Sequence, residues 1–108
     1  MAARKAPPLL LRFGELAIDL EQYRVVLGDR PLLLSYREYA LLVYLASRAG
    51  QVVPKRQLVE EGLGRHDPGG VRMVEEHLRH LKGILERENR TYIEAVGDMG
   101  YRFVGTSS

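Results

Sequence analysis

The chain has 108 residues, of which 45% are hydrophobic and 28% charged, and it contains no cysteine. This length suits a single domain with one modest core, and the composition excludes a disulfide framework, a cysteine-ligated metal site and a disordered chain. The net charge is only +2, although the pI is near 9.1. A strong overall basic field is therefore excluded, and any attraction for nucleic acid must depend on where the charges lie.

Residues 1–9 include two prolines and lack a regular apolar pattern, so we predict a tail or linker there. The domain itself is predicted over residues 10–105, with 106–108 as a second short tail. No apolar run approaches the length of a membrane span, and the basic residues near the start precede no long apolar stretch of the kind found in signal peptides. We therefore expect a cytoplasmic protein with no membrane partner.

Short β-type runs alternate with turns from Leu10 to Leu34. The dipeptide Gly28-Asp29 stands between the apolar runs VVL and RPLLL, which is typical of a two-residue hairpin loop. Glycine suits the first loop position because that position needs a positive φ. The segment predicts a small antiparallel sheet.

A helical pattern begins at Ser35. Ser35 and Glu38 have the spacing of a capping box, in which the serine hydroxyl accepts from the glutamate amide and the carboxylate reaches back. Apolar residues then recur at helical spacing until Gly50, which is typical of a helix stop. These positions are Leu41, Leu42, Leu45, Ala46 and Ala49.

A second, shorter helix is predicted from about Pro54 to Glu61, with Leu58 and Val59 on its buried side. Glycines at 62 and 64 end it, and the residues up to Gly70 form a loop.

A third helix is predicted from Val71 to Glu86. Its apolar stripe consists of Val71, Val74, Leu78, Leu81 and Leu85. The opposite face has Glu76 and Gly83 at its centre. Flanking them are Arg72, Met73, Arg79 and His80. This face can meet the base edges and phosphates of DNA, or it can be a solvated face held by ion pairs four residues apart, Arg72–Glu76 and Glu75–Arg79.

Two further β-type runs, 92–96 and 101–104, flank the turn residues 97–100 and predict a hairpin. The predicted fold is therefore α+β: a winged helix-turn-helix with an N-terminal antiparallel sheet, three helices and a C-terminal β-hairpin wing.

Three motifs occur in this order: LSYREYALL from Leu34, GQVV from Gly50 and GYRF from Gly100. Together they resemble the DNA-binding effector domain of OmpR/PhoB-type response regulators, over residues 13–104. In that family the motifs open the first helix, lead into the second and end the wing. The resemblance implies that this chain is part of a bacterial-type transcriptional regulator and binds double-stranded DNA sequence-specifically. The third helix would lie in the major groove and the wing at the neighbouring minor groove.

The resemblance also implies which residues contact DNA. The expected major-groove residues are Arg72, Met73, Glu76, Arg79 and His80. The expected phosphate-contacting residues are Lys55, Arg65, His77 and Lys82. At Met73, Glu76 and His80 the chain departs from the family pattern, which commonly has threonine, valine and arginine there.

The wing tip, Gly97 and Asp98, departs from the family as well, because the family often places an arginine before the tip. An arginine there would read a narrow minor groove, so we predict a wing with little base discrimination. Leu63 stands where the family often has a tryptophan after the second helix.

The loop 64–70 resembles the family's transactivation loop, which can touch RNA polymerase. The family usually carries an N-terminal receiver domain, which would lie outside this chain.

The alternative to a DNA-binding regulator is a winged-helix protein-interaction module with weakened or lost DNA binding. An enzyme is not expected, because the sequence has no nucleophile elbow, phosphate-cradling glycine motif or carboxylate pair set against a histidine. Three histidines without a metal-ligand spacing predict no metal and no cofactor.

Overall fold

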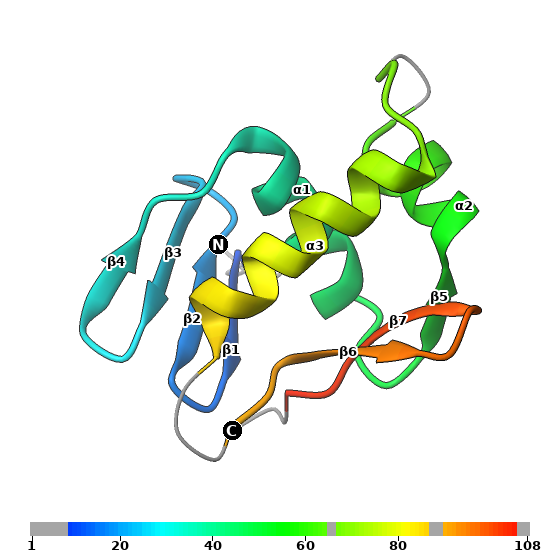
Figure 1. Ribbon diagram of the computed structural model, residues 1–108. Helices are drawn as coiled ribbons and strands as arrows, with labels where there is room; N and C mark the ends of the chain where they lie inside the picture. Colours follow the sequence, from blue (N-terminus) through cyan, green and yellow to red (C-terminus); the bar gives the residue numbers. More distant parts are fainter. Residues whose placement is uncertain (1–8, 65–66, 87–89, 106–108) are drawn as a thin grey trace, which may run out of the picture.

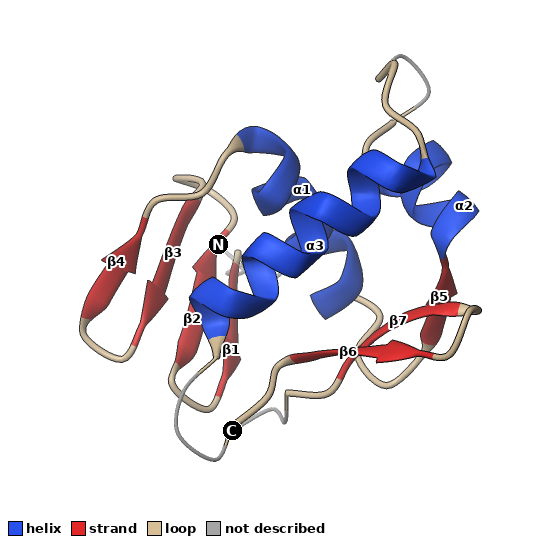
Figure 2. Ribbon diagram, viewed as in Figure 1, coloured by secondary structure: helices blue, strands red, loops and turns tan. Residues whose placement is uncertain are grey.

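The computed structural model describes residues 9–64, 67–86 and 90–105. Two antiparallel sheets flank the helices, and the long helix α3 crosses in front of α1 (Figure 1). The strands are β1 Leu10–Phe13, β2 Leu16–Asp19, β3 Arg24–Leu27, β4 Arg30–Leu32, β5 Val52–Pro54, β6 Ile93–Val96 and β7 Gly100–Phe103. The helical segments are α1 Tyr36–Ala46, α2 Lys55–Gln57, η1 Leu58–Gly62 and α3 Val71–Leu85. This arrangement confirms the predicted α+β winged helix (Figure 2).

The N-terminal sheet has the strand order β1-β2-β3-β4, with each strand antiparallel to the next. Two-residue loops connect β1 to β2 and β3 to β4, and glycine occupies the first position of each. Gly14 has φ 62° and Gly28 has φ 68°, values that most side chains disfavour. The predicted hairpin at Gly28-Asp29 is confirmed.

Helix α1 begins with the predicted capping box. The Glu38 backbone N–H donates to the Ser35 hydroxyl at 3.1 Å, and the Ser35 N–H donates to Glu38 Oε1 at 3.0 Å. The helix ends at Ala46, so the prediction that its apolar stripe continues to Ala49 was wrong, and Ala49 is exposed. The chain must leave the helix early because the Gly50 N–H donates to Phe103 O in β7, at 2.9 Å.

The sequence predicted one continuous α-helix from about Pro54 to Glu61, and this prediction was wrong. Pro54 belongs to β5, α2 is a single turn, and η1 continues as a π-helix in which the Leu63 N–H donates to Leu58 O at 3.0 Å. Leu58, Val59 and Leu63 are buried. The wider π turn brings these residues into the core, and the prediction that Leu58 and Val59 are buried is confirmed.

The wing is a three-stranded sheet with the order β5-β7-β6, and β5 was missed by the sequence analysis. Pro54 pairs with Gly100 and Val53 with Tyr101. A Cβ on Gly100 would lie 1.9 Å from the Val53 carbonyl oxygen, so only glycine fits between these two strands. The glycine of the GYRF motif is therefore a packing requirement.

One core joins both sheets and the helices. At its centre the Phe13 and Phe103 rings, from the two different sheets, meet edge to face with centroids 4.8 Å apart. Tyr92 is also buried against Phe103. Since strands from both sheets contribute, the N-terminal sheet and the wing share one core.

Candidate nucleic-acid interface

Helix α3 separates an apolar face from a polar one, as the sequence predicted. The buried residues are Val74, Leu78, Leu81 and Leu85, with Val71 partly buried at the first turn. The exposed residues are Arg72, Glu76, Arg79, His80 and Gly83. The stripe is therefore confirmed as the side that packs on the core, and we call the exposed set the outer face of α3.

Met73 lies at the border between these faces rather than fully on the outer face. It is partly buried and packs against the core. A Cβ on Gly69 would lie 1.7 Å from the Met73 methyl carbon, so the side chain folds back onto the loop before α3. A thymine-methyl contact from Met73 would require it to leave this position.

Lys55, at the start of α2, forms an ion pair with Glu75 of α3, with 2.7 Å between Nζ and Oε2. The hydrogen bond that Lys55 donates to Glu75 raises the pKa of Lys55, and the same bond lowers the pKa of Glu75. Glu75 is therefore paired across the α2–α3 junction. The Glu75–Arg79 ion pair, which the sequence offered for a solvated helix face, is not formed between these two described side chains. In the described part of the chain, Glu76 makes no ion pair with Arg72 either.

Glu38 connects the start of α1 to the outer face of α3. Its Oε2 bonds with Nδ1 of His80 and lies 3.9 Å from Nδ1 of His77. Burial raises the pKa of Glu38. The hydrogen bonds from His80 and the Ser35 backbone lower it, as do the charges of both histidines. These lowering effects together exceed the effect of burial, so the net pKa of Glu38 is lowered. The sequence predicted both histidines as DNA contacts but gave no sign of their link to Glu38.

The loop before α3 is attached to α1 by an arginine–aspartate pair. Arg37 donates through Nε and Nη2 to the two carboxylate oxygens of Asp67, at 3.1 and 2.9 Å. The bond from Arg37 and a second from the Gly69 backbone lower the pKa of Asp67. Arg65, predicted to contact phosphate, lies outside the described residues.

Gly97 and Asp98 lie in the turn between β6 and β7. Gly97 has φ 53°, and both Gly97 and Asp98 are exposed. Behind the tip, Arg102 of β7 bonds with Glu94 of β6. The arginine nearest to the tip is thus already paired with a carboxylate.

A groove runs between α3 and the wing. It is lined by Glu75, Arg79, Lys82, Gly83, Glu86, Ala95 and Tyr101. Lys82, a predicted phosphate contact, and Arg79 bring positive charge to this groove, while Glu75 and Glu86 oppose it. Mixed charges of this kind are unusual for a surface that would follow a phosphate backbone.

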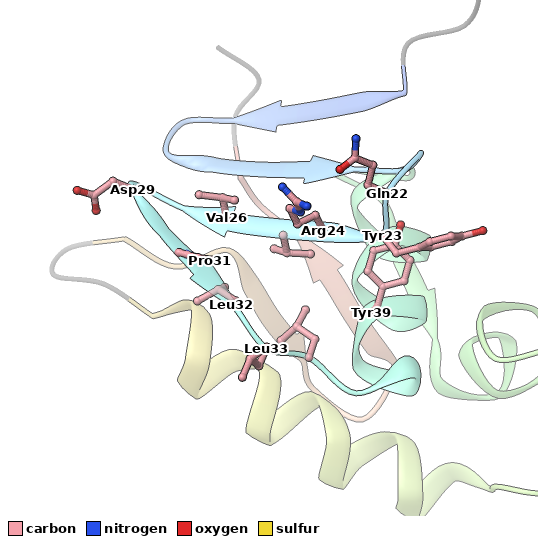
Figure 3. A pocket seen from close by; sticks show the side chains of 11 residues that line it. Gln22, Tyr23, Arg24, Val26, Asp29, Pro31, Leu32, Leu33 and Tyr39 are labelled. Carbon is pink, nitrogen blue, oxygen red and sulfur yellow. The ribbon is translucent and has the colours of Figure 1, made fainter.

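A second hollow lies on the N-terminal sheet, and none of its lining residues belongs to α3 or the wing. Figure 3 shows Tyr23 and Tyr39 at one end of it and Asp29 at the other. The two tyrosine rings meet edge to face with centroids 5.7 Å apart, and Leu33 at its rim is 96% exposed. This hollow contains none of the residues predicted to bind DNA.

Neither a metal site nor a membrane span is found in the part of the chain that the structure describes. Residues 9–64, 67–86 and 90–105 contain no group of three or more histidine, cysteine, aspartate or glutamate side chains that could hold a metal ion. Within the same residues, no helix is long and apolar enough to cross a membrane.

Comparison with known families adds the decisive observation. Residues 29–103 match the family described as "Transcriptional regulatory protein, C terminal". This match covers the three helices and the wing described above. The chain is an OmpR/PhoB-type DNA-binding domain of a transcriptional regulator.

Similar proteins agree with this membership. The transcriptional regulatory protein SrrA of Staphylococcus aureus is 32% identical over 97 residues, which cover 87% of this chain and 40% of SrrA. The chain thus spans about 40% of the length of this relative. Response regulator DrrB of Thermotoga maritima, an OmpR/PhoB homologue, is 32% identical with a TM-score of 0.79, over 90% of this chain and 45% of DrrB.

The DNA-binding domain of RstA from Klebsiella pneumoniae, solved in complex with the RstA box, is similar over nearly its whole length. It is 30% identical to this chain with a TM-score of 0.75, and the match covers 88% of this chain and 96% of the RstA chain. The predicted resemblance and the predicted winged-helix fold are both confirmed.

Proposed function

We propose that the chain binds double-stranded DNA sequence-specifically, with α3 in the major groove. The observation that carries this proposal is the outer face of α3, where arginine, histidine and glutamate side chains are exposed together on one side of a helix whose other side is buried. The RstA domain, which has the same fold, was solved with its DNA site.

In this proposal Arg72, Arg79, His80 and Glu76 contact base edges, and Met73 joins them by turning away from the loop onto which it folds. Lys55, Arg65, His77 and Lys82 contact phosphates and fix the register of α3 on the duplex. Glutamate can accept from cytosine N4, and arginine can pair with guanine, so both signs of charge on the outer face have partners in the major groove.

The full-length protein in this proposal is a response regulator that works in the cytoplasm, where bacterial DNA is located. A receiver domain controls it, and the loop 64–70 contacts RNA polymerase. The match to response regulator DrrB covers 45% of that chain, so DrrB has further residues outside the matched domain. This supports a longer protein with a second domain. A non-enzymatic role fits membership of a transcriptional regulator family.

A protein-interaction module with weakened DNA binding is the second candidate. The ion pair that occupies Lys55 and the acidic tip residue Asp98 favour it, because both reduce the positive charge available to phosphates.

Selection from a random double-stranded DNA pool at one fixed salt concentration separates the two candidates. We expect the wild-type chain to enrich a motif. We expect Glu76→Ala to relax one base position of that motif, worth about 1–3 kcal/mol of discrimination, and to raise non-specific affinity by removing a repulsion. Glu60→Ala, an equal loss of charge at an exposed position of η1, is the matched control and should leave the motif unchanged. Failure of wild type to enrich any motif would favour the interaction module.

A further inference from the structure

His80 is the most exposed member of the bonded cluster between α1 and α3. Its side chain is 67% exposed, whereas the side chain of its partner Glu38 is 6% exposed. One ring nitrogen, Nδ1, bonds with Glu38 Oε2. Among the described residues, none forms a hydrogen bond with the other ring nitrogen, Nε2. His80 therefore offers one free nitrogen on the outer face of α3.

The bond to Glu38 determines which nitrogen carries the proton. An ionised carboxylate only accepts hydrogen bonds, so Nδ1 must be the donor whether the imidazole is neutral or charged. In the neutral ring, Nε2 is then an acceptor. In the charged ring, Nε2 carries a proton and becomes a donor.

The major groove presents opposite partners to these two forms. Adenine N6 and cytosine N4 donate hydrogen bonds, whereas adenine N7, thymine O4 and guanine N7 and O6 accept them; guanine presents two acceptors, so a donor pairs best there. The family commonly has an arginine at this position, and an arginine only donates. Histidine is the side chain whose charge ordinarily changes between pH 5 and 8.

We propose that His80 is a specificity-determining residue whose ring, oriented by Glu38, prefers adenine or cytosine when neutral and guanine when protonated. This inference rests on the proposed function, because it requires α3 to lie in the major groove. Glu38 acts as a positioning residue that does not itself touch DNA.

Other charged groups lie near His80. On α3, Glu76 lies one turn before His80, Arg79 is its neighbour, and His77 approaches the same Glu38 oxygen. From the side of α1 and the preceding loop, Asp67 is neutralised by Arg37 and interacts with His77. Glu38 is thus the carboxylate bonded directly to His80, and His77 is the second imidazole beside the same carboxylate.

The first test is made without DNA. Nitrogen-15 NMR of the imidazole groups in the free chain at pH 8 should show His80 with the proton on Nδ1 and none on Nε2. Glu38→Gln, which removes the ionised acceptor while keeping the shape, should abolish this preference. A dominant Nε2–H form of His80 in the wild-type chain would overturn the proposal.

The second test is selection from one random DNA pool at pH 5.5 and at pH 8.0, with equal ionic strength. We expect one motif position to change from adenine or cytosine at pH 8.0 to guanine at pH 5.5, with a preference on the order of ten-fold. His80→Arg should select guanine at both pH values, and His80→Gln should show no change with pH. His77→Gln removes the other nearby imidazole and a proposed phosphate contact, so it should lower the affinity at both pH values and still keep the change of base.

The outcomes separate this inference from the proposed function. An enriched motif that is the same at both pH values would overturn the role of His80 and leave DNA recognition intact. A change with pH that disappears in His77→Gln but persists in His80→Gln would also overturn it. No motif at either pH would overturn the proposed function and this inference with it.

Discussion

The Lys55 ammonium lies 2.7 Å from the Glu75 carboxylate, so the chain holds its predicted phosphate-binding lysine in an internal ion pair. We expect Glu75→Gln to release Lys55 and to tighten non-specific DNA binding. Each phosphate neutralised on duplex DNA contributes about −0.9 to the slope of log affinity against log salt, so the slope should become steeper by about 0.9. Fluorescence anisotropy with a random duplex over a salt series measures both quantities.

Glu61→Gln makes the same change of charge at a carboxylate that accepts from Tyr44, and it serves as the control. An equal gain in affinity from both variants would mean that net charge, and not Lys55, is responsible.

The wing tip gives a second prediction. Gly97→Arg should tighten binding, most strongly where the duplex beside the major-groove site is rich in A·T pairs, because the narrow minor groove there attracts arginine. Gly97 has a positive φ, so Gly97→Asn, which tolerates that conformation, controls for backbone strain. Affinities for A·T-rich and G·C-rich flanks, measured side by side, check the result. Equal affinities of Gly97→Arg and Gly97→Asn for A·T-rich flanks would show that the tip does not reach the minor groove.

Gly100→Ala should destabilise the fold, because the new Cβ would overlap the Val53 carbonyl of β5. Overpacking of this kind costs about 1–3 kcal/mol in the free energy of unfolding. Urea denaturation followed by circular dichroism measures the loss. Unchanged stability would mean that β5 can move away from β7 at little cost.

Gly83→Ala should have the opposite effect. Gly83 lies exposed in α3, and a Cβ there meets no heavy atom within 4 Å beyond the helix's own backbone. Replacing a helical glycine by alanine stabilises a helix by about 1 kcal/mol. We expect a higher urea midpoint with an unchanged denaturant slope, and a lower midpoint would contradict the open surroundings of Gly83.

Glu38 should make stability depend on pH. The net pKa of Glu38 is lowered from 4.5, so its stabilisation is fully present above pH 4.5 and is lost as pH falls through the lower, folded-state pKa. Glu38→Gln should lose about 1.5–3 kcal/mol at pH 7, the range for hydrogen bonds to a charged group. The difference between wild type and variant should shrink towards pH 3, as measured by urea unfolding at each pH. A difference that stays constant from pH 7 to pH 3 would contradict the ionised state of Glu38.

Local patterns predicted the parts of the fold that depend on neighbours in the sequence. The capping box at Ser35 and the apolar stripe of α3 need residues only three or four positions apart, so the sequence was sufficient for both. Strand β5 was missed because three residues gain strand structure only by pairing with β7, about fifty positions later.

In the candidate interface, too, the sequence predicted the features that depend on nearby residues and missed the contacts between distant ones. The helical wheel identified the exposed side chains of α3, but it could not show that Glu38, forty-two positions before His80, bonds with it. The capping box accounts for one oxygen of Glu38 and leaves the other for a partner that only the packing of α1 on α3 supplies. Lys55 and Glu75 are joined for the same reason, across the junction of two helices.

Strand β5 has a mechanical consequence. Its backbone is hydrogen-bonded to β7, and the next residue, Lys55, begins α2, so the wing and the start of α2 form one stiff unit. The span between the wing tip and Lys55 is therefore set by main-chain bonds, and replacing exposed side chains on this surface leaves those bonds intact. Substitutions on this surface can change which bases are preferred, while the spacing of the contacts along the duplex stays the same.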